Sequence, residues 1–213
     1  MRKLPVYILI DTSGSMRGEP IEAVKAGLNS LFKSLIRDPH ALDSIYISIL
    51  TFDREAKILL PLSELNNNLV LPEIPPLESS PTNLGEALQL MCQLYSKEVK
   101  KSSLEAKGDW LPVAVIMTDG SPSDTMLFEQ MCETLKSNAY PFSRIIGCAA
   151  GPKAKTEPLK KFATDVVFLE TMDSNSFSQF WQWVSQSFSR LSQNTSREVD
   201  ELPPPPEEIK LVL

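Results

Sequence analysis

The stretch VYILIDTSGSMRGEP, residues 6–20, contains the pattern that decides the fold. Its first five residues are apolar and predict a buried strand, which ends at Asp11. A threonine and two serines follow at once, and Pro20 is suited to the first turn of a helix. A short apolar run of this kind is typical of a strand that is covered on both faces. The stretch therefore predicts a strand and a helix, joined where one carboxylate and several hydroxyls gather.

Similar apolar runs recur along the chain and alternate with helical patterns, as in a parallel sheet covered by helices. The predicted strands are residues 5–11, 44–53, 56–62, 111–119, 142–151 and 166–170. The predicted helices are residues 19–38, 83–101, 123–138 and 156–165, with a last helix within residues 174–194. The second and third strands read as a hairpin with a charged turn, which predicts one antiparallel edge strand. We therefore predict a doubly wound α/β fold with a mostly parallel central sheet and helices on both faces.

The chain reads as one domain, residues 1–193, followed by a proline-rich acidic C-terminal tail, residues 194–213. Trp183 lies off the centre of the apolar stripe of the last helix, so we expect it to pack on the helix flank, with partial exposure as the alternative. The tail loses helical periodicity and contains four consecutive prolines. We expect a solvated, disordered end. The alternative is that Glu207, Glu208 and the apolar end reach a neighbouring molecule.

Composition limits the classes of function. The 27 acidic residues outnumber the 21 basic ones, and the formal charge of −6 argues against nucleic acid and anionic membranes as partners. No apolar run approaches the roughly 18 residues of a membrane helix, and the first acid comes too early for a secretory signal. We expect a soluble, cytoplasmic protein. Cys92, Cys132 and Cys148 are widely spaced, which predicts reduced core residues, not a zinc site or disulfides.

The candidate site lies at the carboxyl ends of the strands, where binding sites form in open parallel sheets. Asp11 and Asp119 each end an apolar run, and Thr82 stands at the start of a predicted helix. Together with Ser13 and Ser15 they offer only oxygen ligands, which suit Mg²⁺, with Mn²⁺ or Ca²⁺ as alternatives, and suit zinc poorly. If the hydroxyls bind directly and the acids act through water, the ion keeps enough charge to accept a carboxylate from another molecule.

Other interpretations of the same residues remain open. Residues 11–15 alone are also compatible with an ordinary turn and helix cap. The rival function is a magnesium-dependent phosphohydrolase with Asp11 as nucleophile, although Ser13 stands where that chemistry expects a second acid. A scaffold with a vestigial site is a third class. A serine hydrolase triad would need His40, the sole histidine, which we expect in a loop or at a helix end.

Three motifs, DTSGSM and MTDGSP after buried strands and a threonine before LGEAL, resemble a von Willebrand factor A domain over residues 1 to roughly 193. The resemblance implies a Rossmann-like fold and a metal-ion-dependent adhesion site, without enzymatic activity. Its ligands would be Asp11, Ser13, Ser15, Thr82 and Asp119, and its ion would bridge to an acidic residue of a protein partner. The compact length and the same motifs are most similar to bacterial TerY-like proteins associated with tellurium resistance. That narrower resemblance implies a stress-response role beside a kinase or a phosphatase.

Overall fold

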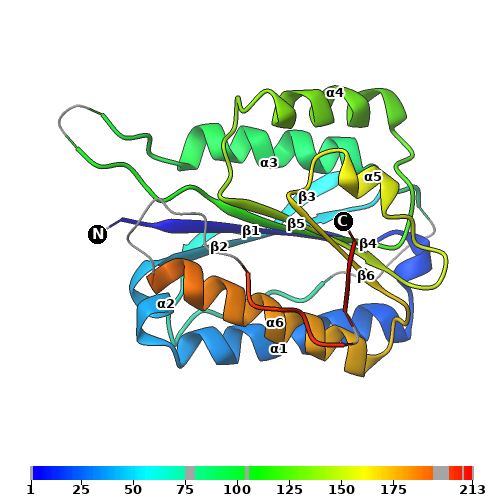
Figure 1. Ribbon diagram of the computed structural model, residues 1–213, viewed down its shortest axis with the longest axis horizontal. Helices are drawn as coiled ribbons and strands as arrows, with labels where there is room; N and C mark the ends of the chain where they lie inside the picture. The colour runs from blue at the N-terminus through cyan, green and yellow to red at the C-terminus, as the bar shows by residue number, and fades with distance from the viewer. Residues whose placement is uncertain (1, 75–79, 104–105, 194–201, 208, 213) are drawn as a thin grey trace.

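A seven-stranded sheet with the order β3-β2-β1-β4-β5-β6-β7 forms the centre of the molecule (Figure 1). The computed structural model describes residues 2–74, 80–103, 106–193, 202–207 and 209–212. The strands are β1 (Leu4–Asp11), β2 (Ile45–Phe52), β3 (Ala56–Glu64), β4 (Val113–Thr118), β5 (Arg144–Ala150), β6 (Asp165–Leu169) and β7 (Lys210–Val212). The helices are η1 (Gly14–Met16), α1 (Glu19–Ile36), α2 (Pro39–Ser44), α3 (Leu84–Glu98), α4 (Thr125–Lys136), α5 (Glu157–Lys160) and α6 (Ser174–Gln193).

The central strands are parallel and buried on both faces, as their apolar runs predict. β1 pairs in parallel with β2 and β4, and every residue of β1 is buried. Figure 1 shows α1, α2 and α6 on one face of the sheet and α3 and α4 on the other. Each face has its own apolar cluster, because alternate residues of a strand point to opposite faces. The predicted doubly wound α/β fold is therefore confirmed.

The two edges of the sheet are antiparallel. β3 pairs antiparallel with β2, as the hairpin pattern predicts. β7, at the other edge, pairs antiparallel with β6 and was not predicted. It belongs to the tail, so the expectation of a solvated, disordered end is wrong for the described tail residues. Residues 194–201, which begin the tail, lie outside the described part, and the division at residue 193 stays a prediction.

Two local expectations, for Trp183 and His40, are confirmed. Trp183 is only 2% exposed, so the expected packing on the flank of α6 is confirmed and the alternative of partial exposure is wrong. His40 lies at the start of α2, where its backbone N–H donates to Asp38, so the expected helix-end position is confirmed although α2 itself was not predicted. Within the described ranges, no helix is both long and apolar enough to cross a membrane.

The three cysteines are buried core residues, as predicted. Burial raises the pKa of Cys92 to about 12 and, with help from nearby Glu129, that of Cys132 to about 11. It also raises the pKa of Cys148 far above the ordinary range. Because the thiolate is the reactive form, we expect none of them to react with Ellman's reagent at pH 8 in the folded chain, and all three to react in urea. Rapid reaction of a native thiol would contradict the packing described for these side chains.

Candidate metal centre

Asp11 is held at the end of β1 by two hydrogen bonds that use both of its carboxylate oxygens. The backbone N–H of Ser13 donates to Oδ1 at 2.8 Å, and the hydroxyl of Thr118, at the end of β4, donates to Oδ2 at 2.6 Å. Asp11 is 0% exposed. The ends of β1 and β4 meet here because the two strands are parallel neighbours. The buried carboxylate is thus fixed in position by both strands.

A chain of hydroxyls connects this point to the second acid. The side-chain oxygens of Ser13 and Ser15 lie 3.2 Å apart, and the Ser15 hydroxyl donates to Asp119 Oδ1 at 2.9 Å. The short helix η1 begins directly after Ser13 and contains Ser15, and its last residue, Met16, is buried in the core. Ser15 itself is exposed, so the cluster opens to solvent at this residue.

Thr82 joins the cluster from a third segment. Its backbone N–H donates to Ser123 Oγ at 3.1 Å, and the N–H of Ser123 donates back to the Thr82 carbonyl at 2.8 Å. A Cβ added to Gly120 would lie 3.2 Å from Thr82 Oγ1, so the threonine side chain faces the residue next to Asp119. The loop after β4 therefore presents one acid and also positions the threonine.

Asp124 ties the same loop to the start of α3. Its two carboxylate oxygens accept from the N–H groups of Gly85 at 3.1 Å and Glu86 at 2.8 Å. These are N–H groups that a helix start leaves without partners, so Asp124 caps α3 from another segment. Gly85 permits this close approach, because a Cβ there would lie 2.5 Å from the backbone nitrogen of Phe128.

We expect Asp124→Ala to lower the free energy of unfolding by about 1–2 kcal/mol, because the partly buried N–H groups of Gly85 and Glu86 lose their acceptor. The matched control is Asp38→Ala, which removes a single bond to the N–H of His40 at the start of the short helix α2. Urea denaturation measures both. If Asp124→Ala costs no more than Asp38→Ala, the connection between the two loops is not the stabilising contact that the geometry indicates.

The electrostatics of the cluster favour a cation. Burial raises the pKa of Asp11 to about 6, against hydrogen bonds from Thr118 and Ser13 that lower it. Burial also raises the pKa of Asp119. Two carboxylates that are withdrawn from water at the carboxyl ends of neighbouring strands gain stability from a positive charge between them.

The donor set fits a hard divalent ion. It contains two carboxylates and three hydroxyls, from Asp11, Ser13, Ser15, Thr82 and Asp119, and no imidazole or thiolate. Nowhere in the described part of the chain do three or more His, Cys, Asp or Glu residues form a metal-binding group. Any metal at these strand ends would therefore depend on the hydroxyls as ligands.

The structure brings the predicted residues together. Asp11, Ser13, Ser15 and Asp119 form one hydrogen-bonded chain, and Thr82 lies beside Gly120. The interpretation as an ordinary turn and helix cap accounts only for the bond from Ser13 N to Asp11, because the Ser13 side chain makes no cap bond to η1 and the residue before α1 is Gly18. Coordination of an ion by the five residues stays a prediction.

Three positioning residues were not identified from the sequence. They are Thr118, Ser123 and Asp124, which hold Asp11, Thr82 and the start of α3. All three belong to TDGSPSD, residues 118–124, so the density of polar side chains in that stretch was the available signal. Their partners, however, lie on other segments and cannot be read from the stretch itself.

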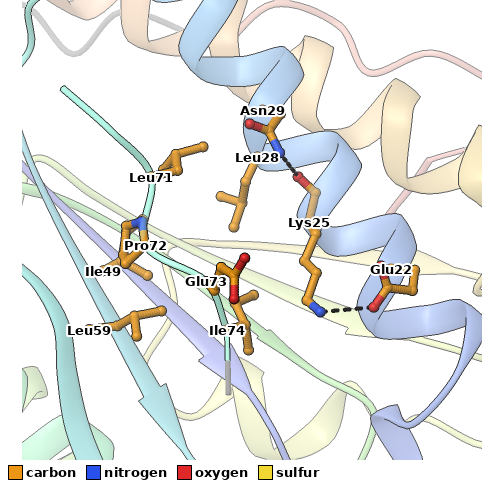
Figure 2. A pocket seen from close by; sticks show the side chains of 10 residues that line it. All are labelled: Glu22, Lys25, Leu28, Asn29, Ile49, Leu59, Leu71, Pro72, Glu73 and Ile74. Carbon is orange, nitrogen blue, oxygen red and sulfur yellow. Dashed lines mark hydrogen bonds and ion pairs between the residues drawn. The ribbon is translucent and has the colours of Figure 1, made fainter. Parts of the chain in front are cut away.

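A pocket of about 360 Å³ lies away from this cluster, between α1, β2, β3 and residues 71–74 (Figure 2). Aliphatic side chains from these elements line it, and the ion pair of Lys25 with Glu22 lies at its side. None of the five candidate residues lines the pocket. The strand-end cluster is thus a separate feature of the surface.

Comparison with known proteins identifies a family model over most of the chain. Residues 6–187 match the von Willebrand factor type A domain. An uncharacterized protein of Synechocystis is 28% identical over 121 residues, which are 56% of this chain and 26% of that protein. This chain therefore matches only about a quarter of the length of that relative.

Solved structures show the same fold at low sequence identity. Proximal thread matrix protein 1 from the mussel byssus, with a zinc-occupied MIDAS motif, has a TM-score of 0.62 at 16% identity, covering 87% of this chain and 48% of that one. A von Willebrand factor type A structure from Catenulispora acidiphila has a TM-score of 0.62 at 14% identity, covering 88% of this chain and 43% of that one. This chain spans less than half of either protein. These matches do not support the narrower TerY-like resemblance, which stays a prediction.

Proposed function

The chain belongs to the von Willebrand factor type A domain family, and from this membership and the strand-end geometry we propose that it is a divalent-metal-dependent protein-interaction module. Domains of this family bind a divalent metal at the metal-ion-dependent adhesion site and are generally not enzymes. We assign Asp11, Ser13, Ser15, Thr82 and Asp119 as the residues that hold the ion. The ion we propose is Mg²⁺, with Mn²⁺ or Ca²⁺ as alternatives, because all the donors are oxygen.

The observation that carries the proposal is the hydrogen-bonded chain from Asp11 through Ser13 and Ser15 to Asp119. A bound divalent ion would supply a centre of positive charge to which a partner carboxylate can bind. Asp11 supplies negative charge from the buried side, while Ser15 lies on the exposed side. The proposed partner group is therefore an acidic side chain that approaches from solvent.

The surface beside the cluster supports a partner with an apolar group next to that acid. Met126 lies in the first turn of α4, directly after the loop that carries Asp119, and is 88% exposed. An exposed methionine at a binding surface adapts to many apolar side chains. We propose that Met126 contacts the partner without contacting the ion.

The phosphohydrolase alternative is less compatible with the structure. Both oxygens of Asp11 accept hydrogen bonds and the residue is fully buried, whereas a nucleophile must reach a substrate phosphorus. We therefore propose that the chain is not an enzyme and expect no magnesium-dependent turnover of p-nitrophenyl phosphate. Turnover that Asp11→Asn abolishes would support the alternative.

Affinity capture tests the interaction directly. The immobilised chain is incubated with a cell lysate in Mg²⁺ and is then washed with EDTA. The variants Asp11→Asn/Asp119→Asn and Met126→Lys are treated in the same way. We expect the wild type to retain proteins that EDTA releases and the double variant to retain none of them. Met126→Lys should retain less while binding the metal normally. Identical retention in Mg²⁺ and EDTA would contradict the proposal.

The identity of the partner remains part of the proposal. We propose a kinase or phosphatase of a stress-response system, such as the tellurium system of the TerY-like proteins, because the narrower resemblance implies that class. The cytoplasmic location expected from the sequence also stays a prediction.

A further inference from the structure

The described C-terminal residues lie on a surface of the domain that α6 and the outer edge of β6 form. The segment, in red, follows α6 and then turns toward β6 (Figure 1). We propose that this surface is a second interaction site, which binds proline-rich peptides that end in an apolar strand. In this structure the chain's own residues 202–207 and 209–212 cover it.

The proline half of the segment is recognised by an aromatic hydrogen-bond donor. The indole N–H of Trp183 donates to the carbonyl of Pro203 at 2.7 Å, and Pro203 is buried. Leu202 packs against the same apolar cluster. A proline-rich strand offers carbonyls and no N–H groups, so an indole N–H beside an apolar surface is suited to bind it. Trp183 thus gives this surface a hydrogen-bond donor for the carbonyl of a proline.

The apolar half of the segment is recognised by the sheet. Ile209 is 3% exposed and belongs to the core cluster, and its N–H donates to the carbonyl of Pro206 at 3.0 Å, which turns the chain. Residues 210–212 then pair with β6, with Lys210 opposite Phe168 and Val212 opposite Val166. Lys210 also forms an ion pair with Glu170. Addition of a strand to an exposed sheet edge is a common mode of peptide recognition.

The last part of the segment, β7, is short and partly exposed, so it is the part that is released most easily. β7 has three residues, and the side chains of Lys210 and Leu211 are exposed. Elements with little buried apolar surface open at low free-energy cost. Attachment to the same chain gives the segment a high effective concentration, so it excludes competing peptides while it remains connected.

The test is a full chain with a specific protease site inserted between residues 197 and 198, so that the tail can be cut after folding. The probe is a fluorescein-labelled peptide of residues 202–213. We expect the uncut chain to bind no probe, and the cut chain, diluted to release its tail, to bind the probe saturably at micromolar concentration. Circular dichroism checks that the cut chain stays folded.

Matched variants identify the contacts. Trp183→Phe removes the N–H donor and should weaken probe binding about 10-fold. The control is Trp110→Phe, at a tryptophan that stacks under Arg2 and lies outside this surface. It should leave binding unchanged. A probe with Ile209→Asp should not bind. Unfolding on cleavage, no binding to the cut chain, or binding that neither Trp183→Phe nor Ile209→Asp changes would overturn the proposal.

Discussion

Asp11→Asn combined with Asp119→Asn is expected to abolish binding of Mg²⁺ and Mn²⁺ while the chain stays folded. The amide oxygen that replaces Asp11 Oδ1 can still accept from the Ser13 N–H, but both negative charges are lost. Neutral oxygens alone bind a divalent ion poorly, so we expect at least a 100-fold loss of affinity by titration calorimetry. The control Asp43→Asn/Glu133→Gln removes the same charge from exposed positions and should bind normally.

Asp11 also makes the stability of the metal-free chain depend on pH. Because the pKa of Asp11 is raised from its ordinary 3.8 to about 6 in the fold, the folded state binds more protons than the unfolded state between these values. The stability of the metal-free wild type should therefore fall as pH rises from 4 to 6. At pH 7 the buried charge of Asp11 lowers the free energy of unfolding by at most about 3 kcal/mol.

Asp11→Asn should remove this loss of stability, because the side chain no longer carries a charge. Part of the gain is offset, because the bond from Thr118 to Oδ2 is lost. We therefore expect the single variant to be more stable than the wild type in EDTA at pH 7, with the advantage shrinking toward pH 4. Urea denaturation across this pH range measures it. Equal pH profiles for the two chains would show that burial does not raise the pKa of Asp11 as described above.

Gly27→Ala is expected to destabilise the chain by about 3 kcal/mol or more. Gly27, on α1, lies against the indole of Trp181 on α6, and an added Cβ would lie 2.0 Å from Cδ1 and 2.6 Å from Nε1. Because no methyl group fits, the two helices must separate or the indole must move within a fully packed core. The gain in helix propensity, about 1 kcal/mol, is too small to compensate.

Urea denaturation tests this prediction, with Ala26→Gly as the control at the neighbouring exposed position of the same helix. The control should cost only about 1 kcal/mol, from propensity alone. Adding Trp181→Leu to Gly27→Ala should cost less than the sum of the two changes, because both act on one contact. A Gly27→Ala chain as stable as the wild type would contradict the packing of α1 on α6.

Much of the fold was predictable because its signals are local. β1, β4 and β5 are apolar runs of the length that a doubly covered sheet requires, and α1 carries a clear apolar face. β7 was not predictable in this way. Three residues, Lys210–Val212, carry no periodic signal, and their pairing with β6 depends on a contact distant in the sequence. The hydrogen bond from the Trp183 indole to Pro203 depends on a distant contact of the same kind, whereas the packing of Trp183 on the flank of α6 was predicted.

The candidate site was predictable to a similar depth. Asp11 and Asp119 follow buried strands, so sheet geometry alone places them at one edge. The roles of Thr118 and Asp124 could not be predicted, because they depend on loop conformations that bring separate segments within hydrogen-bonding distance. The sequence pattern thus predicted the groups that are proposed to hold the ion, and the structure added the groups that position them.

We propose that one divalent ion binds where the ends of β1 and β4 meet the segment of Thr82, and nuclear magnetic resonance with Mn²⁺ locates such an ion directly. Paramagnetic Mn²⁺ broadens amide signals near its binding site, so it is added in small amounts to the labelled wild-type chain. We expect the amides of Ser13, Thr82 and Gly120 to lose intensity first, with Trp183 unaffected, and excess Mg²⁺ to restore them. Broadening centred on the acidic tail or elsewhere, or none at these three amides, would contradict the proposed metal site.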